Sequence, residues 1–321
     1  RSRGLGDVYK RQAVAFLAEH APQLGIALAD NHDSYKRYPQ LHDICVSARQ
    51  EVAPEDIAAR RAAGVGEPLN VIACENGIRA TSQLREEVYK HLSAEEAAWC
   101  DAHVGFADCS VDRIVPPVAF PEPLDVAAEA FHEWNVERSA WVGEPPQLSG
   151  MHLTDELEAH IERKLFTLNT GHCATAYLGH LKGYVTIAEA LADERIFGLV
   201  RGAMRQSGEA LIRKFGFGRA QHAAYIDSVL RRFRNPWLRD TVARVGHDPA
   251  RKLSAPLYFS YPITLAAGYG LAVDKLALAA AAALRFDDPA DGQCAEIRET
   301  IARIGLPAAV RRITGIDDDR L

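Results

Sequence analysis

The pattern of the chain changes at residues 143–150, where the string GEPPQLSG interrupts the regular hydrophobic spacing. Before this point, short apolar runs alternate with amphipathic segments, which is typical of an open α/β sheet. After it, almost every long segment has helical spacing. We therefore predict an α/β part over residues 13–146 and a mainly α-helical domain over residues 147–321.

Short apolar runs in the first part are predicted strands. Leu69 to Cys74 has the sequence LNVIAC and Val104 to Cys109 has VGFADC. Runs of this kind favour strands that are buried on both faces of a parallel sheet. Residues 126–136 are predicted to form a further strand. Between the first two runs lie an amphipathic helix and a Ser93–Glu96 capping box, which gives a strand–helix–strand order.

The second part is predicted to consist of helices. Thr154 can cap a first helix, and Thr186 with Glu189 forms a second capping box. Further amphipathic segments cover residues 187–214, 220–233, 271–285 and 293–304.

Composition narrows the classes of function. Hydrophobic residues make up 48% of the chain and the net charge is −6, so we expect a globular protein with neither nucleic acid nor membrane as partner. The longest apolar run, Leu276 to Leu284, has nine residues and is too short to span a bilayer. The six cysteines contain no CxxC pair, which favours reduced thiols and a cytoplasmic protein. We also expect a monomer.

The segment Arg163 to Lys182 is the strongest candidate for chemistry. It contains Lys164, Asn169 and His172 in a K-x4-N-x2-H spacing. At about 100° per residue of an α-helix, all three side chains can face one groove. A solvated polar face is the alternative, but most of the neighbouring residues are apolar, which indicates a buried helix.

These residue types suit the oxidation of a secondary alcohol. An amine in an apolar site has its pKa lowered toward neutrality, so Lys164 can act as a general base. The amide of Asn169 can donate to the oxygen as it becomes an alkoxide, and His172 can orient the substrate. No metal is needed, and neither HExxH, GxSxG nor a P-loop lysine occurs; His172 and His180 are badly spaced for a shared metal.

The same segment resembles the catalytic helix of the polyol-specific long-chain dehydrogenases, the mannitol dehydrogenase family, whose signature is K-x4-N-x2-H. The longer string ERKLFTLNTGHCATAYLGHLKGY is similar to the mannitol-1-phosphate 5-dehydrogenases of that family. Further similar strings are NVIACEN, VGFADCSVDRIVPP, HAAYI, RFRNPWLRD and RKLSA. The resemblance implies an incomplete Rossmann-type, dinucleotide-binding sheet before a helical catalytic and substrate domain, with NAD as the cofactor.

The resemblance also implies roles for the catalytic residues. Lys164 would be the general base, and Asn169 would hold the reacting oxygen together with Asn76, which also lies beside the cofactor. His172 would bind substrate hydroxyls. Taken alone, Asn76 is equally consistent with a helix N-cap that follows a strand.

Four further residues are implied in substrate binding. Asp112 and Arg113 would lie at the cleft between the domains, although the pair alone is typical of a structural ion pair. Arg251 and Lys252 of RKLSA offer an arginine and a lysine for a phosphate, although the pair alone is equally typical of a solvated turn.

The implied reaction is an NAD-dependent interconversion of D-mannitol 1-phosphate and D-fructose 6-phosphate. One departure bears on the phosphate, because Pro256 to Phe259 stands where the family has a charged stretch. Mannitol 2-dehydrogenase or hexuronate reductase activity of the same superfamily therefore remains an alternative. A non-catalytic helical module is a third reading.

The beginning of the chain is unusual. The string DVYKRQ within residues 1–12 can be encoded by GATGTGTATAAGAGACAG, which resembles a transposon end used in sequencing libraries, and we interpret these residues as a translated adapter scar. The family's Gly-rich turn follows a strand, whereas Gly64-Val65-Gly66 precedes one. We therefore expect a truncated N-terminal part, with residues 13–50 unassigned, and weak or no binding of NADH.

Overall fold

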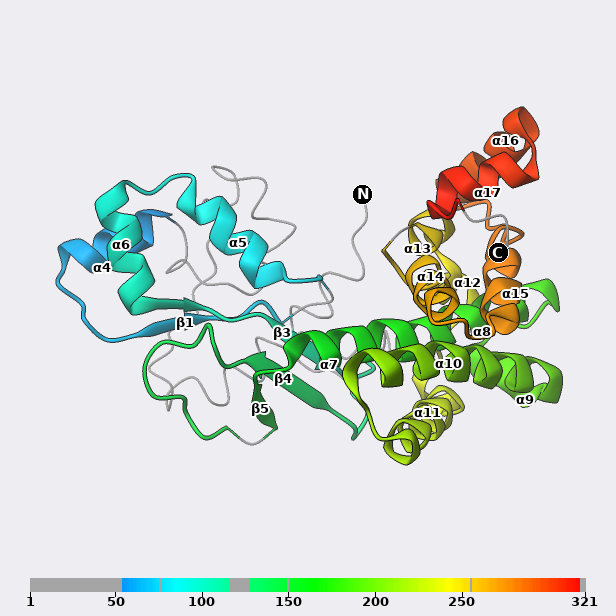
Figure 1. The fold of residues 1–321 in the computed structure, drawn as a ribbon, viewed down its shortest axis with the longest axis horizontal. Helices are drawn as coiled ribbons and strands as arrows, with labels where there is room; N and C mark the ends of the chain where they lie inside the picture. Colours follow the sequence, from blue (N-terminus) through cyan, green and yellow to red (C-terminus); the bar gives the residue numbers. More distant parts are fainter. Residues whose placement is uncertain (1–53, 75–76, 116–126, 149, 255, 318–321) are drawn as a thin grey trace. The chain divides into compact units, whose positions relative to one another are not determined.

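The computed structural model describes residues 54–74, 77–115, 127–148, 150–254 and 256–317 (Figure 1). The chain forms two compact units, Arg1–Ile161 and Glu162–Leu321. The units divide after the predicted boundary at residues 146 and 147, because the strand and the helix that follow the Pro/Gly-rich stretch still pack largely with the first unit.

The first unit contains a parallel strand pair that two helices connect. Strand β1 (Leu69–Val71) pairs with β2 (Val104–Phe106), and α5 (Ala80–Tyr89) and α6 (Ala94–His103) lie between them in sequence. The preceding helix α4 (Pro54–Ala62) packs against the same core through Ile57. Both predicted strands are confirmed but are shorter than expected, since pairing stops at Val71 and Phe106.

A second sheet in this unit has the strand order β3-β4-β5. Strand β3 (Cys109–Asp112) is antiparallel to β4 (Glu133–Glu137), which is parallel to β5 (Met151–Thr154). The strand predicted over residues 126–136 therefore begins later. Strand β5 was missed, because four residues beside a Pro/Gly-rich stretch carry too little periodicity.

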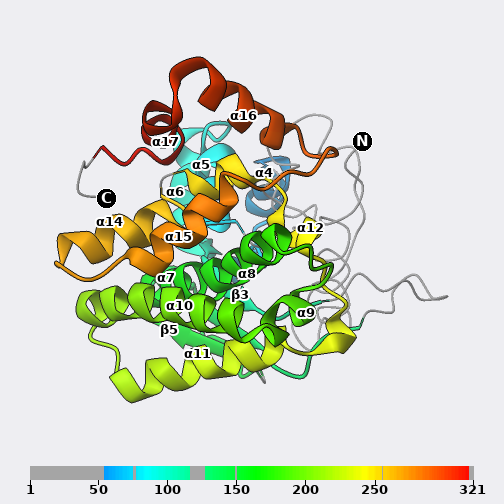
Figure 2. The same cartoon turned by 90° about the vertical axis from the view of Figure 1, so that its right-hand side faces the viewer.

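The second unit is helical and is built around α8 (Thr170–Leu181), as Figure 2 shows. Helices α9, α10, α12 and α15 contact α8. Every α8 residue from Thr170 to Gly179 is buried except His172. Helix α7 (Leu157–Arg163) crosses the division between the units. The elements after it are a π-helix (Lys164–Asn169), α8, α9 (Ile187–Ala192), α10 (Glu194–Phe215), α11 (Arg219–Phe233), a 3-10 helix (Pro236–Leu238), α12 (Val242–Gly246), α13 (Pro249–Leu253), α14 (Ser260–Gly268), α15 (Asp274–Ala283), α16 (Gly292–Ile304) and α17 (Leu306–Thr314).

The long helix predicted over residues 187–214 is two helices. Asp193 interrupts it, because its carboxylate accepts hydrogen bonds from the amides of Arg195 at 2.8 Å and Ile196 at 3.3 Å and so caps α10. The predicted capping box of Thr186 and Glu189 is confirmed at the start of α9. Within the described ranges, no helix is long and apolar enough to cross a membrane.

The central position of α8 makes its glycines sensitive to substitution. A Cβ at Gly179 would lie 2.8 Å from Ala190 Cβ and 3.3 Å from Val242 Cγ2, both of which belong to packed helices. We expect Gly179→Ala to lower the free energy of unfolding by about 1–3 kcal/mol through overpacking. Exposed Gly198 in α10 has no atom within 4 Å of a built Cβ, so Gly198→Ala should stabilise by about 0.5–1 kcal/mol. Urea unfolding measures both; equal effects would contradict the close packing of α8.

Candidate functional site

The predicted catalytic segment is not a regular α-helix at its start. Residues Lys164–Asn169 form a π-helix, in which the amide of Thr170 donates to the carbonyl of Leu165, five residues back. Residues five apart are therefore separated by about one turn, and Lys164 and Asn169 lie on the same side. The α-helical angle that we assumed would have separated them by about 140°. The expected α-helical winding is corrected, and the π-winding reduces the angle between the two residues around the helix axis.

Two hydroxyl groups donate to backbone carbonyls of this π-helix, one from a distant helix and one from the residue that follows. Ser207 of α10 donates its hydroxyl to the carbonyl of Phe166. The hydroxyl of Thr170 lies 3.2 Å from the carbonyl oxygen of Leu165 and 2.5 Å from that of Tyr258. A widened turn leaves carbonyls poorly aligned along the helix, so partners from outside it are needed.

Buried His222 of α11 supports the same turn. Its Nε2 lies 3.3 Å from the hydroxyl oxygen of Thr167, and its ring stacks on Phe217 with a centroid distance of 5.9 Å. Burial, and secondarily the charge of Arg163, lower the pKa of His222 from 6.5 to about 4. The ring is therefore neutral at pH 7.

Lys164 and Asn169 are both half-buried. The lysine is therefore not in bulk solvent. A general base with a lowered pKa requires such partial burial. That its amine is uncharged stays a prediction.

His172 faces Asp240, a residue to which we had assigned no role. The Nε2 atom of His172 lies 2.8 Å from Oδ2 of Asp240, and the imidazole stacks on Phe233 at a centroid distance of 4.4 Å. The Nε atom of Arg244 donates to Oδ1 of the same carboxylate at 2.7 Å. Burial alone would raise the pKa of Asp240, but His172 and Arg244 hold that pKa below its ordinary value. Asp240 ends the RFRNPWLRD string, and this was the only signal in the sequence.

Tyr258 is a second residue that we did not predict. Its pKa is raised by burial and by Cys173, against the opposing charge of Arg251 and hydrogen bonds with Arg251 and Asn169. The phenol therefore connects the predicted oxyanion-binding amide with a predicted phosphate-binding arginine. Tyr258 belongs to the stretch that departs from the family pattern, and this departure was the signal in the sequence that could have identified the residue.

Arg251 and Lys252 lie in different environments although they are neighbours. Lys252 is buried, its Nζ donates to the carbonyl of Val245 at 2.6 Å, and burial lowers its pKa. The side chain of Arg251 is 48% exposed, with Nη2 3.5 Å from Oδ2 of Asp248. Of this pair, the arginine is the more accessible to an anion.

The remaining predicted residues belong to the first unit. Asp112 is buried at the end of β3, whereas exposed Arg113 donates its Nε to the carbonyl of Glu129 at 3.0 Å. Asn76 lies outside the described residues. The roles assigned to these three residues stay predictions.

Two family models match the chain. The mannitol dehydrogenase Rossmann domain matches residues 47–150, and the mannitol dehydrogenase C-terminal domain matches residues 156–306. The chain belongs to the mannitol dehydrogenase family. The predicted family and the predicted order of an α/β part before a helical domain are thereby confirmed.

Solved structures share the fold of this mannitol dehydrogenase family member. D-sorbitol dehydrogenase in substrate-free form matches with a TM-score of 0.64 at 23% identity, over 79% of this chain and 55% of that one. Mannitol 2-dehydrogenase from Pseudomonas fluorescens, in a ternary complex with NAD and D-mannitol, matches with a TM-score of 0.62 at 24% identity, over 85% and 65%. The chain thus spans less than two thirds of the length of either protein.

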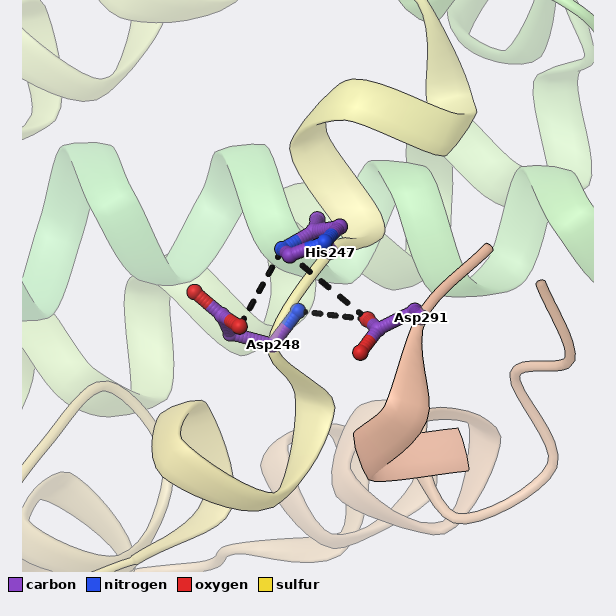
Figure 3. A group of neighbouring side chains, drawn as sticks. All are labelled: His247, Asp248 and Asp291. Carbon is purple, nitrogen blue, oxygen red and sulfur yellow. Dashed lines mark hydrogen bonds and ion pairs between the residues drawn. The ribbon is translucent and has the colours of Figure 1, made fainter. Parts of the chain in front are cut away.

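One group of side chains has the composition of a metal site, namely His247, Asp248 and Asp291 (Figure 3). The carboxylate of Asp291 is buried, and its oxygens accept hydrogen bonds from the amides of Asp248 at 2.7 Å and Gln293 at 3.0 Å. His247 Nδ1 lies 3.1 Å from Asp248 Oδ1. Helix capping and an ion pair therefore explain this group without a metal.

The buried imidazole beside the π-helix predicts an acid-sensitive fold. Because the folded pKa of His222 is about 4, the unfolded chain binds a proton below pH 6.5 that the folded protein does not. Stability should therefore fall as pH drops through 6.5, by about 2 kcal/mol between pH 7 and pH 5, and this loss should level off below about pH 4.

His222→Gln keeps an amide near Thr167 and removes the titration, so this loss should disappear. Urea unfolding at both pH values measures the difference between the two proteins. Equal losses for wild type and variant would contradict a buried neutral ring.

Proposed function

We propose that this chain carries the catalytic and substrate-binding part of an NAD-dependent dehydrogenase that interconverts D-mannitol 1-phosphate and D-fructose 6-phosphate. The π-helix is the observation that carries the proposal, because its winding puts half-buried Lys164 and Asn169 on one side of a helix within the family's C-terminal domain. π-turns of this kind occur frequently at functional sites. The similarity of the ERKLFTLNTGHCATAYLGHLKGY string to the phosphate-specific enzymes supports this substrate.

The side chains divide the chemistry between them. Lys164 removes the hydroxyl proton of the substrate, which requires its amine to be uncharged before the reaction. Asn169 donates its amide to the oxygen as negative charge develops, and this interaction is stronger in the transition state than in the bound alcohol. NAD, when bound, accepts the hydride from the alcohol carbon. His172 binds a neighbouring hydroxyl and fixes the orientation of the substrate.

The first unit fits a dinucleotide. Its strands β1 and β2 are parallel and their carboxyl ends lie side by side, which is the edge where dinucleotides bind in open α/β sheets. The match to the family's Rossmann domain and the NAD complex of the similar mannitol 2-dehydrogenase support the same cofactor. Asn76, which follows β1, is proposed to lie beside it.

A second candidate substrate is an unphosphorylated hexitol such as mannitol or sorbitol. The environment of Lys252 favours it, because this ammonium is buried on the carbonyl of Val245. Arg251 is then the main candidate for binding a phosphate, and Tyr258 already bonds to it. The two similar solved proteins, named for sorbitol and mannitol, fit this alternative as well.

Replacing the proposed base tests the chemistry. At millimolar NAD, we expect the protein to form NADH with mannitol 1-phosphate, and Lys164→Ala to reduce kcat by about 10²–10⁴-fold, since a general base is lost. Lys182→Ala is the matched control, because this lysine pairs with Asp193 at 2.6 Å and should leave turnover unchanged. Both variants should unfold at the same urea concentration as the wild type to within a small shift. Full turnover in Lys164→Ala would refute the mechanism. Absence of turnover in the wild type would favour the alternative of a non-catalytic helical module.

Removing the accessible arginine tests the substrate. If Arg251 binds a phosphate, Arg251→Ala should raise KM for mannitol 1-phosphate by about 10–100-fold, because a charge-assisted hydrogen bond is lost. The KM for mannitol should change little. Initial rates with mannitol 1-phosphate, mannitol and sorbitol measure both effects. A wild type that oxidises mannitol or sorbitol, but not the phosphate, would establish the second candidate instead.

A further inference from the structure

The carboxylate of Asp240 is buried and is shared between two side chains. The residue is 8% exposed, and the guanidinium of Arg244 binds Oδ1 through Nε at 2.7 Å. The other oxygen, Oδ2, lies 2.8 Å from Nε2 of His172. Neither Oδ2 nor Nε2 has a hydrogen-bond partner in the described part of the chain, so this ion-pair contact is the close polar contact that the two atoms make there.

The imidazole of His172 is also held from its face. It stacks on Phe233 of α11 with an interplanar angle of 14°, and its side chain is only 16% exposed. A ring flip would turn Nε2 away from Asp240 and leave a buried carboxylate oxygen without a partner, which is costly. The packing thus fixes which nitrogen meets the carboxylate.

We propose that Asp240 is a positioning residue that keeps a ring proton of His172 on Nε2, so that Nδ1 is the atom that accepts a hydrogen bond from a polyol hydroxyl when the ring carries one proton. An ionised carboxylate can only accept hydrogen bonds, and Arg244 can only donate them. With Arg244 on Oδ1, the nitrogen that faces Oδ2 must carry a hydrogen. Nδ1 of the neutral ring then has a free lone pair.

The inference rests on the proposed function for the identity of the ligand, but the position of the proton can be measured without it. Asp240→Asn keeps the size of the side chain and replaces one acceptor by a donor. Arg244 retains the amide oxygen, so the NH2 group faces Nε2, which must then accept. The proton of His172 is expected to move to Nδ1.

Nitrogen-15 NMR of the histidine rings at a pH of about 8.5, where an unperturbed imidazole is neutral, reports the tautomer directly. The His172 signals are assigned by their loss in His172→Gln. We expect protonated Nε2 in the wild type and protonated Nδ1 in Asp240→Asn. A wild-type ring protonated on Nδ1, or a ring unchanged in Asp240→Asn, overturns the proposal. If Asp240→Asn does not fold, Asp240→Glu should retain the wild-type tautomer, and a ring protonated on Nδ1 there counts against it.

Kinetics provide the second readout. Asp240→Asn should raise KM for the polyol substrate by about tenfold, which is the effect of one lost hydrogen bond. The change in kcat should be smaller. The matched control is Asp227→Asn, because Asp227 also pairs with an arginine, Arg201, at 2.9 Å, but on the surface of α10 and α11. An unchanged KM would overturn the role in substrate binding. Absence of any polyol turnover in the wild type would instead refute the proposed function, while the NMR result still decides the position of the proton.

Discussion

The burial of α8 at the centre of the second unit is the constraint on which the candidate site depends. Four helices, α9, α10, α12 and α15, contact α8, so a polar side chain on it must find a partner inside the protein. His172 does so with Asp240, and Asp240 in turn with Arg244. The apolar environment that stabilises the helix is therefore the same environment that orients its imidazole.

The π-helix before α8 is a local departure that the surrounding unit makes possible. Ser207 donates to the carbonyl of Phe166, Thr170 to that of Leu165, and the ring of His222 lies beside the hydroxyl of Thr167. The benefit is geometric, because Lys164 and Asn169 come to one side of the helix. A regular α-helix would need no such support, but it would also separate the base from the amide.

Tyr258 shows how a substituted stretch far along the chain can change the surroundings of the proposed catalytic helix. In place of a charged segment, Pro256 to Phe259 brings a half-buried phenol to Asn169 and Arg251, while Phe259 fills the core beside Tyr177. The substituted stretch thus places a phenol next to the proposed oxyanion-binding amide.

The sequence alone determined the order of an α/β part and a helical part, the two parallel strands, the capping boxes and the K-x4-N-x2-H segment. These features are encoded by neighbours within one or two turns of the chain, so periodicity and residue type suffice to predict them. Only the tertiary structure decided the π-winding, the His172–Asp240 contact, the place of Tyr258 and the burial of Lys252. The distant partners of Phe166, Thr167 and Thr170 lie 41 to 88 residues away along the chain, and no local pattern predicts such a partner.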